Sequence, residues 1–236
     1  MNTRSQLLCA WSGPAFVVLF TVGFWFVAHY LPPPSPTAGA QEIAALYREN
    51  TSQIRLGMFL MMACSALIAP FVAAIAVQMK RMESGFPVLT YAQLSSGTVG
   101  ILFFILPAMV WTTAAFRPER DAELILLLND LGWILFLMPF TSFVVQNICI
   151  GIAVLASKVE QPPFPRWTGY FNFWVAVLFV PGGLLTFFKT GPFAWNGLFV
   201  FWLPLVIFFV WYGVMFVLLR NAILRQADQL VTKGYD

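Results

Sequence analysis

The stretch from 190 to 219, TGPFAWNGLFVFWLPLVIFFVWYGVMFVLL, contains no Asp, Glu, Lys or Arg. The same is true of the stretches 5–41, 56–79, 84–116, 131–157 and 167–188. A hydrocarbon core of about 30 Å is crossed by a helix of about 20 apolar residues, and each stretch holds a run of that length. The pattern predicts an all-α, polytopic membrane protein with six transmembrane helices.

We expect the spans at about 7–31, 56–79, 90–116, 131–156, 167–188 and 197–219, in a single transmembrane helical domain that covers 1–236. The composition agrees, because 60% of the residues are hydrophobic, 10% are charged and the mean hydropathy is +0.79. These values lie far from those of soluble domains. The loops are too short to form a soluble domain, so function is expected inside the bundle or at its faces.

Two regions next to the spans need separate treatment. Pro32 to Pro34 end the first span, and the segment 38–50 then places Ile43 and Tyr47 at helical spacing. It predicts a short amphipathic helix in the first external loop, either on the membrane surface or packed on the bundle. In the fourth region the polar pair Asn129 and Asp130 interrupts an apolar run. There we expect a surface or partly re-entrant turn up to Asn129, then a span from near Asp130.

The basic residues predict the orientation. With a cytoplasmic N-terminus, the outer segments hold five of the 13 Lys and Arg: Arg48, Arg55, Arg117, Arg120 and Lys189. The inner segments hold the other eight: Arg4, Lys80, Arg81, Lys158, Arg166, Arg220, Arg225 and Lys233. This bias follows the positive-inside rule. We therefore expect both termini in the cytoplasm, with the chain in a bacterial inner (plasma) membrane.

Asp130 is the most suggestive single residue. A carboxylate at the lip of a span is costly unless it is hydrated or paired, so it marks either a helix N-terminal cap or a polar pocket. Cations expected at the same face would pair with it, and the aromatic turn that follows Lys189 would cover it. The candidate pocket comprises Asp130, Asn129, Arg117, Arg120, Lys189, Trp195 and Asn196.

Four amide side chains fall within or at the end of the predicted spans: Gln78, Gln146, Asn147 and Asn172. Such residues commonly form hydrogen bonds between helices in membranes. The alternative is that they line a substrate path. Either interpretation places them toward the interior of the bundle.

Several classes of site are excluded by composition. The single histidine, His29, and the scattered Cys9, Cys64 and Cys149 cannot furnish a transition-metal or haem site, and the cysteines are expected as packing residues. No phosphate-binding loop, serine-nucleophile elbow or other catalytic motif occurs. A net charge of +3 is too small to suggest nucleic-acid binding. We expect no cofactor, no metal and no catalytic residue.

The leading hypothesis is a non-enzymatic membrane protein that handles a hydrophobic molecule or scaffolds a transport complex, with the lipid bilayer and other membrane subunits as partners. A stand-alone secondary transporter or exporter of a lipophilic small molecule is the first alternative. The second is a cofactor-free intramembrane enzyme that uses Asp130 with Arg117 or Arg120. The charge-free centres of the spans argue against transport of ions or other charged solutes.

Overall fold

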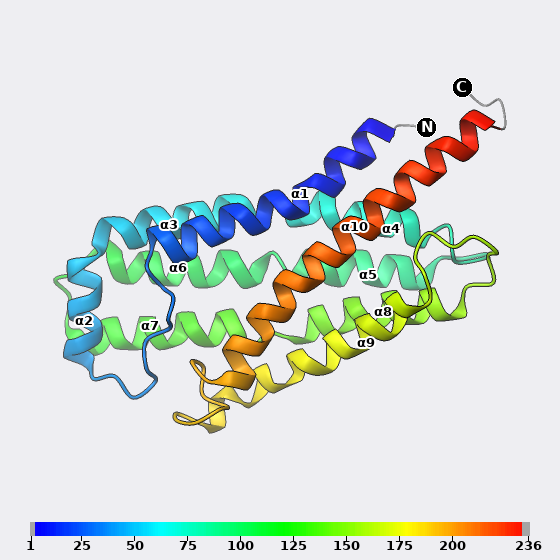
Figure 1. Ribbon diagram of the computed structural model, residues 1–236. Coiled ribbons are helices and arrows are strands. Elements are labelled where there is room, and N and C mark those ends of the chain that lie inside the picture. The colour runs from blue at the N-terminus through cyan, green and yellow to red at the C-terminus, as the bar shows by residue number, and fades with distance from the viewer. Residues whose placement is uncertain (1–2, 233–236) are drawn as a thin grey trace.

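The computed structural model describes residues 3–232, which form helices and no strand (Figure 1). Lys233, one of the expected inner cations, lies outside them. The first half contains α1 (Thr3–Thr21), the π-helical turn η1 (Val22–Val27), α2 (Ala40–Glu49), α3 (Thr51–Ser65), α4 (Ile68–Met79), α5 (Val88–Val99) and α6 (Leu102–Phe116). The second contains α7 (Ala122–Leu137), α8 (Thr141–Ala156), α9 (Trp167–Phe179), the 3-10 turn η2 (Val180–Phe187), the π-helical turn η3 (Leu198–Trp202) and α10 (Leu203–Thr232).

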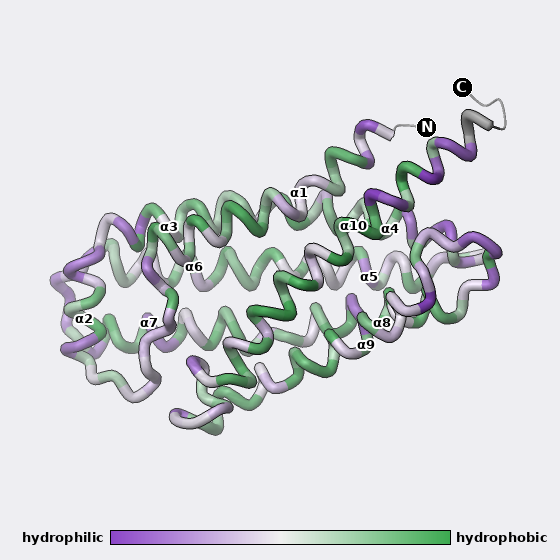
Figure 2. The backbone as a smooth tube through the Cα atoms, viewed as in Figure 1, coloured by the Kyte–Doolittle hydropathy of each residue, from purple (hydrophilic) through white to green (hydrophobic). Residues whose placement is uncertain are grey.

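These elements form six segments that are long and apolar enough to cross a membrane: Thr3–Val27, Thr51–Met79, Val88–Phe116, Ala122–Ala156, Trp167–Phe187 and Leu198–Gln229. The prediction of an all-helical protein with six spans is confirmed. Hydrophilic residues gather at the two ends of the bundle, with a hydrophobic band between them (Figure 2). The chain is therefore an integral membrane protein.

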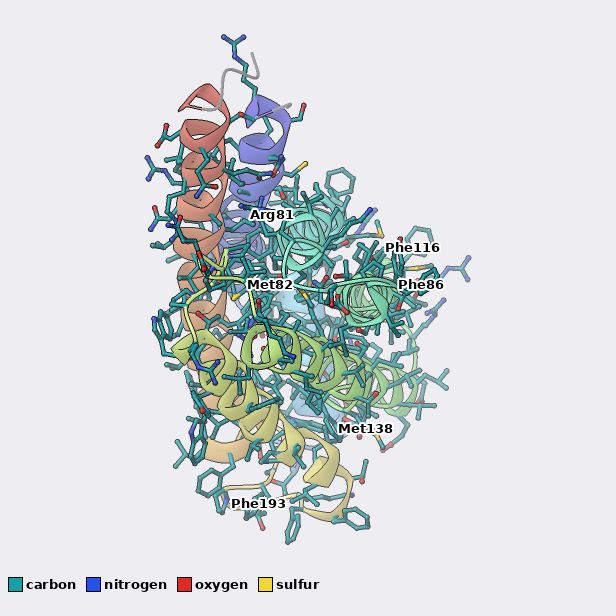
Figure 3. The ribbon with its side chains drawn as sticks, turned by 90° about the vertical axis from the view of Figure 1, so that its right-hand side faces the viewer. Arg81, Met82, Phe86, Phe116, Met138 and Phe193 are labelled. Carbon is teal, nitrogen blue, oxygen red and sulfur yellow. The ribbon has the colours of Figure 1, made fainter. Side chains whose placement is uncertain are left out.

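Both described ends of the chain lie at one end of the bundle, and α2 lies across the other (Figure 1). We call these the terminal end and the α2 end. In Figure 3, a view along the bundle from the terminal end, α1 and α10 run side by side at one edge, where they contact each other. The other main pairs are α3 with α6, α6 with α7, α5 with α8, and α8 with α9.

Small residues allow some of these helices to approach closely. A Cβ atom on Gly57 in α3 would lie 2.5 Å from the backbone oxygen of Gly23 in η1 and 2.5 Å from the Cβ of Ala28. No side chain fits at such a distance, so glycine is required at position 57. Close backbone approach of this kind is typical of helix pairs in membranes, where packing rather than hydrophobic exclusion holds helices together.

The short helix expected at 38–50 is present as α2, and it packs on the bundle. Its apolar face, formed by Ile43, Ala44 and Tyr47, is buried, and the helix lies against α7. Arg48, on another side, donates from Nε to the backbone oxygen of Pro118 at 3.0 Å, which ties α2 to the turn between α6 and α7. Of the two alternatives for this segment, packing on the bundle is the one that the structure supports.

The expected turn before Asn129 is wrong. The fourth span begins instead at Ala122, with the Asp121 side chain as the cap, accepting from the backbone N–H of Glu123 at 2.9 Å. The apolar residues before Asn129 continue a regular helix, which tolerates two adjacent polar residues because only Asn129 faces the protein core, while Asp130 is half-buried. The helix is interrupted later, at Pro139, between α7 and α8.

Candidate ligand-binding cavity

Three spans are interrupted near their middles: α3 gives way to α4 after Ser65, α5 to α6 after Val99, and α7 to α8 after Leu137. Two others change helix type toward one end, where α9 continues as η2 and α10 begins after η3. Prolines explain part of this pattern, because a proline removes a backbone donor and clashes with the carbonyl four residues before it. Pro70 stands four residues after Ala66 at the first break, Pro139 lies within the third, and Pro181 opens η2.

The breaks meet around one cavity of about 120 Å³. Every break contributes lining residues, among them Ile68, Gly100, Pro139, Gly182 and Pro204. The complete lining is Phe20, Ile68, Gly97, Gly100, Phe103, Phe104, Phe136, Leu137, Pro139, Phe140, Ser142, Phe143, Gln146, Phe179, Gly182, Val200, Phe201, Pro204, Leu205, Phe208 and Tyr212. None of these side chains is charged.

Aromatic rings form most of the wall and hold one another in place. Phe20 meets Phe104 edge to face at a centroid distance of 5.3 Å, and Phe208 lies 4.9 Å from Tyr212. On the other side, Phe143 and Phe179 are 4.6 Å apart. Offset and edge-to-face contacts of this kind stabilise aromatic pairs beyond their buried area. The cavity therefore has ordered, apolar walls suited to a small hydrophobic or aromatic group.

Two residues of α8 that line the cavity carry buried polar atoms. Ser142 and Gln146 line the cavity one helical turn apart, and neither Ser142 Oγ nor Gln146 Nε2 has a hydrogen-bond partner in the described part of the chain. Gln93, on the facing helix α5, is fully buried with both amide atoms unpartnered. Buried polar atoms are normally paired, so this group is unusual within the bundle.

The sequence predicted Gln146 as a polar residue of the interior. It did not predict that Ser142, Gln93 and a wall of aromatic rings lie beside it. Prolines recur within the spans, which was a signal for broken helices. That signal does not reveal that the breaks meet at one place. Of the other predicted amides, Gln78 donates to Gln6 Oε1 of α1 at 2.8 Å, and Asn172 accepts from Trp211 Nε1 of α10 at 3.0 Å.

Asn147 makes its hydrogen bond within its own helix, from Nδ2 to the backbone oxygen of Phe143 at 2.8 Å. Its Oδ1 atom has no partner among residues 3–232. Gln146 makes no hydrogen bond to another helix in that range either. The interhelical bonding expected of these two residues is therefore absent there; against the Gln146 amide stands Gly97, which has no side chain to bond with.

Asp130 belongs to a different region, at the α2 end. It lies about two turns inside α7, half-buried, and accepts a hydrogen bond from Asn129 Nδ2 at 3.3 Å. Lys189 is near enough to act electrostatically on its carboxylate, but no salt bridge to Asp130 occurs within residues 3–232. The salt bridge expected there is absent, since the early start of α7 carries Asp130 away from the turn that holds Arg117 and Arg120.

The remaining residues of the predicted pocket point to separate partners. Arg117 is exposed, whereas Arg120 donates from Nη1 to the backbone oxygen of Thr113 at 3.0 Å. Trp195 donates from Nε1 to the backbone oxygen of Pro34 at 2.8 Å, and the backbone oxygen of Asn196 accepts from Trp202 Nε1 at 3.2 Å. These contacts fasten the loops at the α2 end and do not assemble around Asp130.

Asn129 instead joins a buried hydrogen-bonded chain. Tyr30 donates to the hydroxyl of Tyr47 at 2.7 Å, Tyr47 donates to Asn129 Oδ1 at 3.4 Å, and Trp111 Nε1 donates to the backbone oxygen of Asn129 at 3.4 Å. Burial raises the pKa of Tyr30 and that of Tyr47 well above the usual value. Both phenols are therefore neutral at physiological pH, and the chain acts as a structural link between α2 and α7.

No group of three His, Cys, Asp or Glu side chains that could hold a metal ion occurs within the described range 3–232. His29 has a left-handed backbone conformation, with φ of 56°, after the end of η1. Cys9, Cys64 and Cys149 are free thiols. The shape and apolar lining of the cavity suit a hydrophobic ligand. No protein-family model, curated protein or solved structure compared with the chain matches it significantly.

Proposed function

We propose that this integral membrane protein is a carrier that binds a small lipophilic molecule in the cavity between its broken helices. The observation that carries the proposal is the meeting of the helix breaks around one aromatic cavity. An engineered apolar cavity of about 150 Å³ in another protein binds benzene, and this one, at about 120 Å³, is of similar size. Broken helices near the middle of the membrane are also typical of transporter binding sites.

The lining supports a lipophilic rather than an ionic ligand. A charged group moved from water into a site without an opposite charge loses its hydration at great cost. The cavity offers aromatic rings, aliphatic side chains and neutral polar groups, and no ionised side chain. This favours the stand-alone transporter over a scaffold, since a scaffold has no need of such a cavity.

The enzyme hypothesis draws no support from the geometry. It requires Asp130 close to Arg117 or Arg120, and Asp130 makes no salt bridge to either within residues 3–232. Asp130 also does not line the cavity. We therefore make no proposal of catalysis.

Ligand extraction from purified protein tests the proposal. Leu205 lines the cavity, and Leu205→Trp should fill it; Val206, its neighbour in α10, is 56% exposed, and Val206→Trp is the matched control. We expect mass spectrometry of organic extracts to find the same small lipophilic compound with wild type and Val206→Trp, and about tenfold less with Leu205→Trp. Equal amounts in all three proteins, or none in wild type, would contradict the proposal.

We also propose that both termini face the cytoplasm, on the strength of the basic residues at the terminal end. Single cysteines in a background free of Cys9, Cys64 and Cys149 test this. Ser84 is exposed at the terminal end, and Gly39, at the start of α2, has open space around it. A membrane-impermeant maleimide should label Gly39→Cys in intact cells and Ser84→Cys only after lysis. The reverse pattern would invert the topology.

A further inference from the structure

The charged side chains are divided unequally between the two ends of the bundle. At the α2 end, six Asp and Glu accompany five Lys and Arg, whereas the described part of the terminal end has seven Lys and Arg and three Asp and Glu. These are the cations Arg4, Lys80, Arg81, Lys158, Arg166, Arg220 and Arg225, and the acids Glu83, Glu160 and Asp228. An excess of one sign of charge attracts ions of the other, so the terminal end attracts anions.

Two of these cations, Arg81 and Arg225, come together beside a pair of bonded glutamines. Arg81 donates from Nη1 to Gln78 Oε1 at 2.6 Å, and Gln78 Nε2 donates to Gln226 Oε1 of α10 at 3.2 Å. Arg225, the residue before Gln226, donates from Nη2 to the backbone oxygen of Pro163 at 2.8 Å. Figure 3 shows Arg81 between α4 and α10, which contact each other. Both guanidinium groups are therefore held in place by neighbouring segments of the bundle.

The charges of the two arginines are not neutralised within the described chain. Their hydrogen bonds go to neutral oxygens, and neither Glu83 nor Asp228, the acids nearest to them in the sequence, forms a salt bridge with them among residues 3–232. Glu83 accepts instead from two backbone N–H groups at the start of α5. Burial and the nearby charge of Arg225 lower the pKa of Arg81, which nevertheless stays charged. An anion bound between the two groups would relieve their repulsion.

We propose that Arg81 and Arg225 bind one phosphate group between them at the terminal end of the bundle. A guanidinium group has five N–H donors, of which Arg81 uses one and Arg225 two within residues 3–232. The donors that remain can form paired hydrogen bonds to phosphate oxygens, which is the geometry that arginine favours. A phosphate group carries up to two negative charges, which match the two cations.

The depth of the site is that of the lipid headgroups. Arg81 follows the second span, which ends at Met79, by two residues, and Arg225 lies close to the end of the sixth, at Gln229. Basic pockets between transmembrane helices bind the headgroups of anionic lipids in this way. A phosphorylated solute reaches the same place from the water, so the phosphate has two possible sources. The site is separate from the cavity, because neither arginine lines it.

Two probes distinguish the sources. Inorganic phosphate is titrated into the full-length protein in phosphatidylcholine nanodiscs, at constant ionic strength, and its binding is measured by calorimetry. For the lipid, the protein is transferred to micelles that contain equal amounts of phosphatidylglycerol and phosphatidylcholine, and native mass spectrometry counts the molecules of each that stay bound. We expect wild type to retain phosphatidylglycerol in preference to phosphatidylcholine, whose choline group cancels the phosphate charge.

Variants assign the binding to the two arginines. Arg81→Gln and Arg225→Gln each remove one charged donor and should weaken binding about tenfold, and either serves if the other fails to fold. Arg220→Gln is the matched control, because it removes the same charge from α10 at an exposed position without a hydrogen bond in the range 3–232. It should bind within about twofold of wild type. Leu205→Trp, which fills the cavity, should also bind phosphate as wild type does.

Each outcome decides the proposal. Retention of phosphatidylglycerol alone assigns the site to a lipid headgroup, binding of inorganic phosphate assigns it to a solute as well, and loss in Arg81→Gln and Arg225→Gln confirms it in both cases. If neither probe binds to wild type, the proposal is wrong. Wild-type binding in Arg81→Gln and Arg225→Gln, or equal weakening in these two and Arg220→Gln, would also overturn it, because the diffuse charge of the terminal end would then explain the result. The carrier proposal is tested separately by the extraction from Leu205→Trp.

Discussion

The α2 end and the cavity both bury polar side chains among aromatic rings. These side chains are hydrogen-bonded to one another at the α2 end but have unpartnered atoms beside the cavity. At the α2 end, Tyr30, Tyr47 and Asn129 bond to one another in a continuous chain. Beside the cavity, Gln93 and Gln146 retain unpartnered amide atoms within the described bundle. Paired buried groups specify one packing arrangement, whereas unpaired ones lower stability and call for a specific explanation. The contrast agrees with a structural role for the first region and with the binding site that we propose in the second.

The largest expected effect comes from disturbing the α2 end at Gly132. A Cβ atom there would lie 2.1 Å from Trp111 Nε1, and the Trp111 ring is fully buried between Tyr30 and Trp133. Gly132→Ala must displace this ring and its bond to Asn129, so we expect a loss of about 3 kcal/mol in the free energy of unfolding. Thermal unfolding in detergent, followed by Trp fluorescence, measures it.

Gly213→Ala is the control, because a Cβ at that position in α10 meets nothing within 4 Å. It should leave stability unchanged or raise it by about 0.5–1 kcal/mol. If both alanines have the same effect, the packing of Trp111 does not hold the α2 end together.

A smaller effect is expected from Tyr47→Phe. This change removes one hydroxyl that both accepts from Tyr30 and donates to Asn129, so two buried groups lose their partners. The expected loss is about 1–3 kcal/mol. Tyr170→Phe, at a position that is 57% exposed, should have no measurable effect on the same unfolding transition. A neutral Tyr47→Phe would remove the contrast between the two regions.

The same phenols predict a loss of stability at alkaline pH. Burial raises the pKa of Tyr30 and of Tyr47 in the folded protein, whereas in the unfolded chain both titrate near the usual value of about 10. Above that pH the unfolded state binds fewer protons than the folded state, so stability falls as pH rises. Each phenol contributes up to about 1.4 kcal/mol per pH unit. Melting temperatures from pH 8 to 11 should fall more steeply for wild type than for Tyr47→Phe, and parallel curves would contradict the assignment.

The parts of this fold that were predictable are those encoded locally. Charge-free runs give the six spans, and the periodicity of Ile43 and Tyr47 gives α2. The depth of Asp130 was not predictable, because it depends on the N-terminal cap that Asp121 provides. A candidate pocket built on the sequence position of Asp130 therefore combined residues that the fold separates.

The cavity depends on non-local geometry, and the sequence pointed to only part of it. Gln146 is recognisable as an amide within an apolar span, but an amide that pairs with another helix and one that lines a cavity look alike in sequence. Gln78, with partners on α1 and α10, is the first kind, and Gln146 is the second. Which of the two occurs is decided by what stands opposite, here the glycine at position 97.

The smallest expected effect is also the sharpest test of the comparison. Gln93 is fully buried with both amide atoms unpartnered, so Gln93→Met, which keeps the length of the side chain, removes a desolvated group without breaking a bond between residues 3–232. Stability should stay the same or rise by up to about 1 kcal/mol. Gln78→Met removes an amide that donates to Gln6 and Gln226, and should cost about 1 kcal/mol or more. Equal losses in the two variants would mean that Gln93 is as well bonded as Gln78, in which case Gln93 is a structural residue like those of the α2 end.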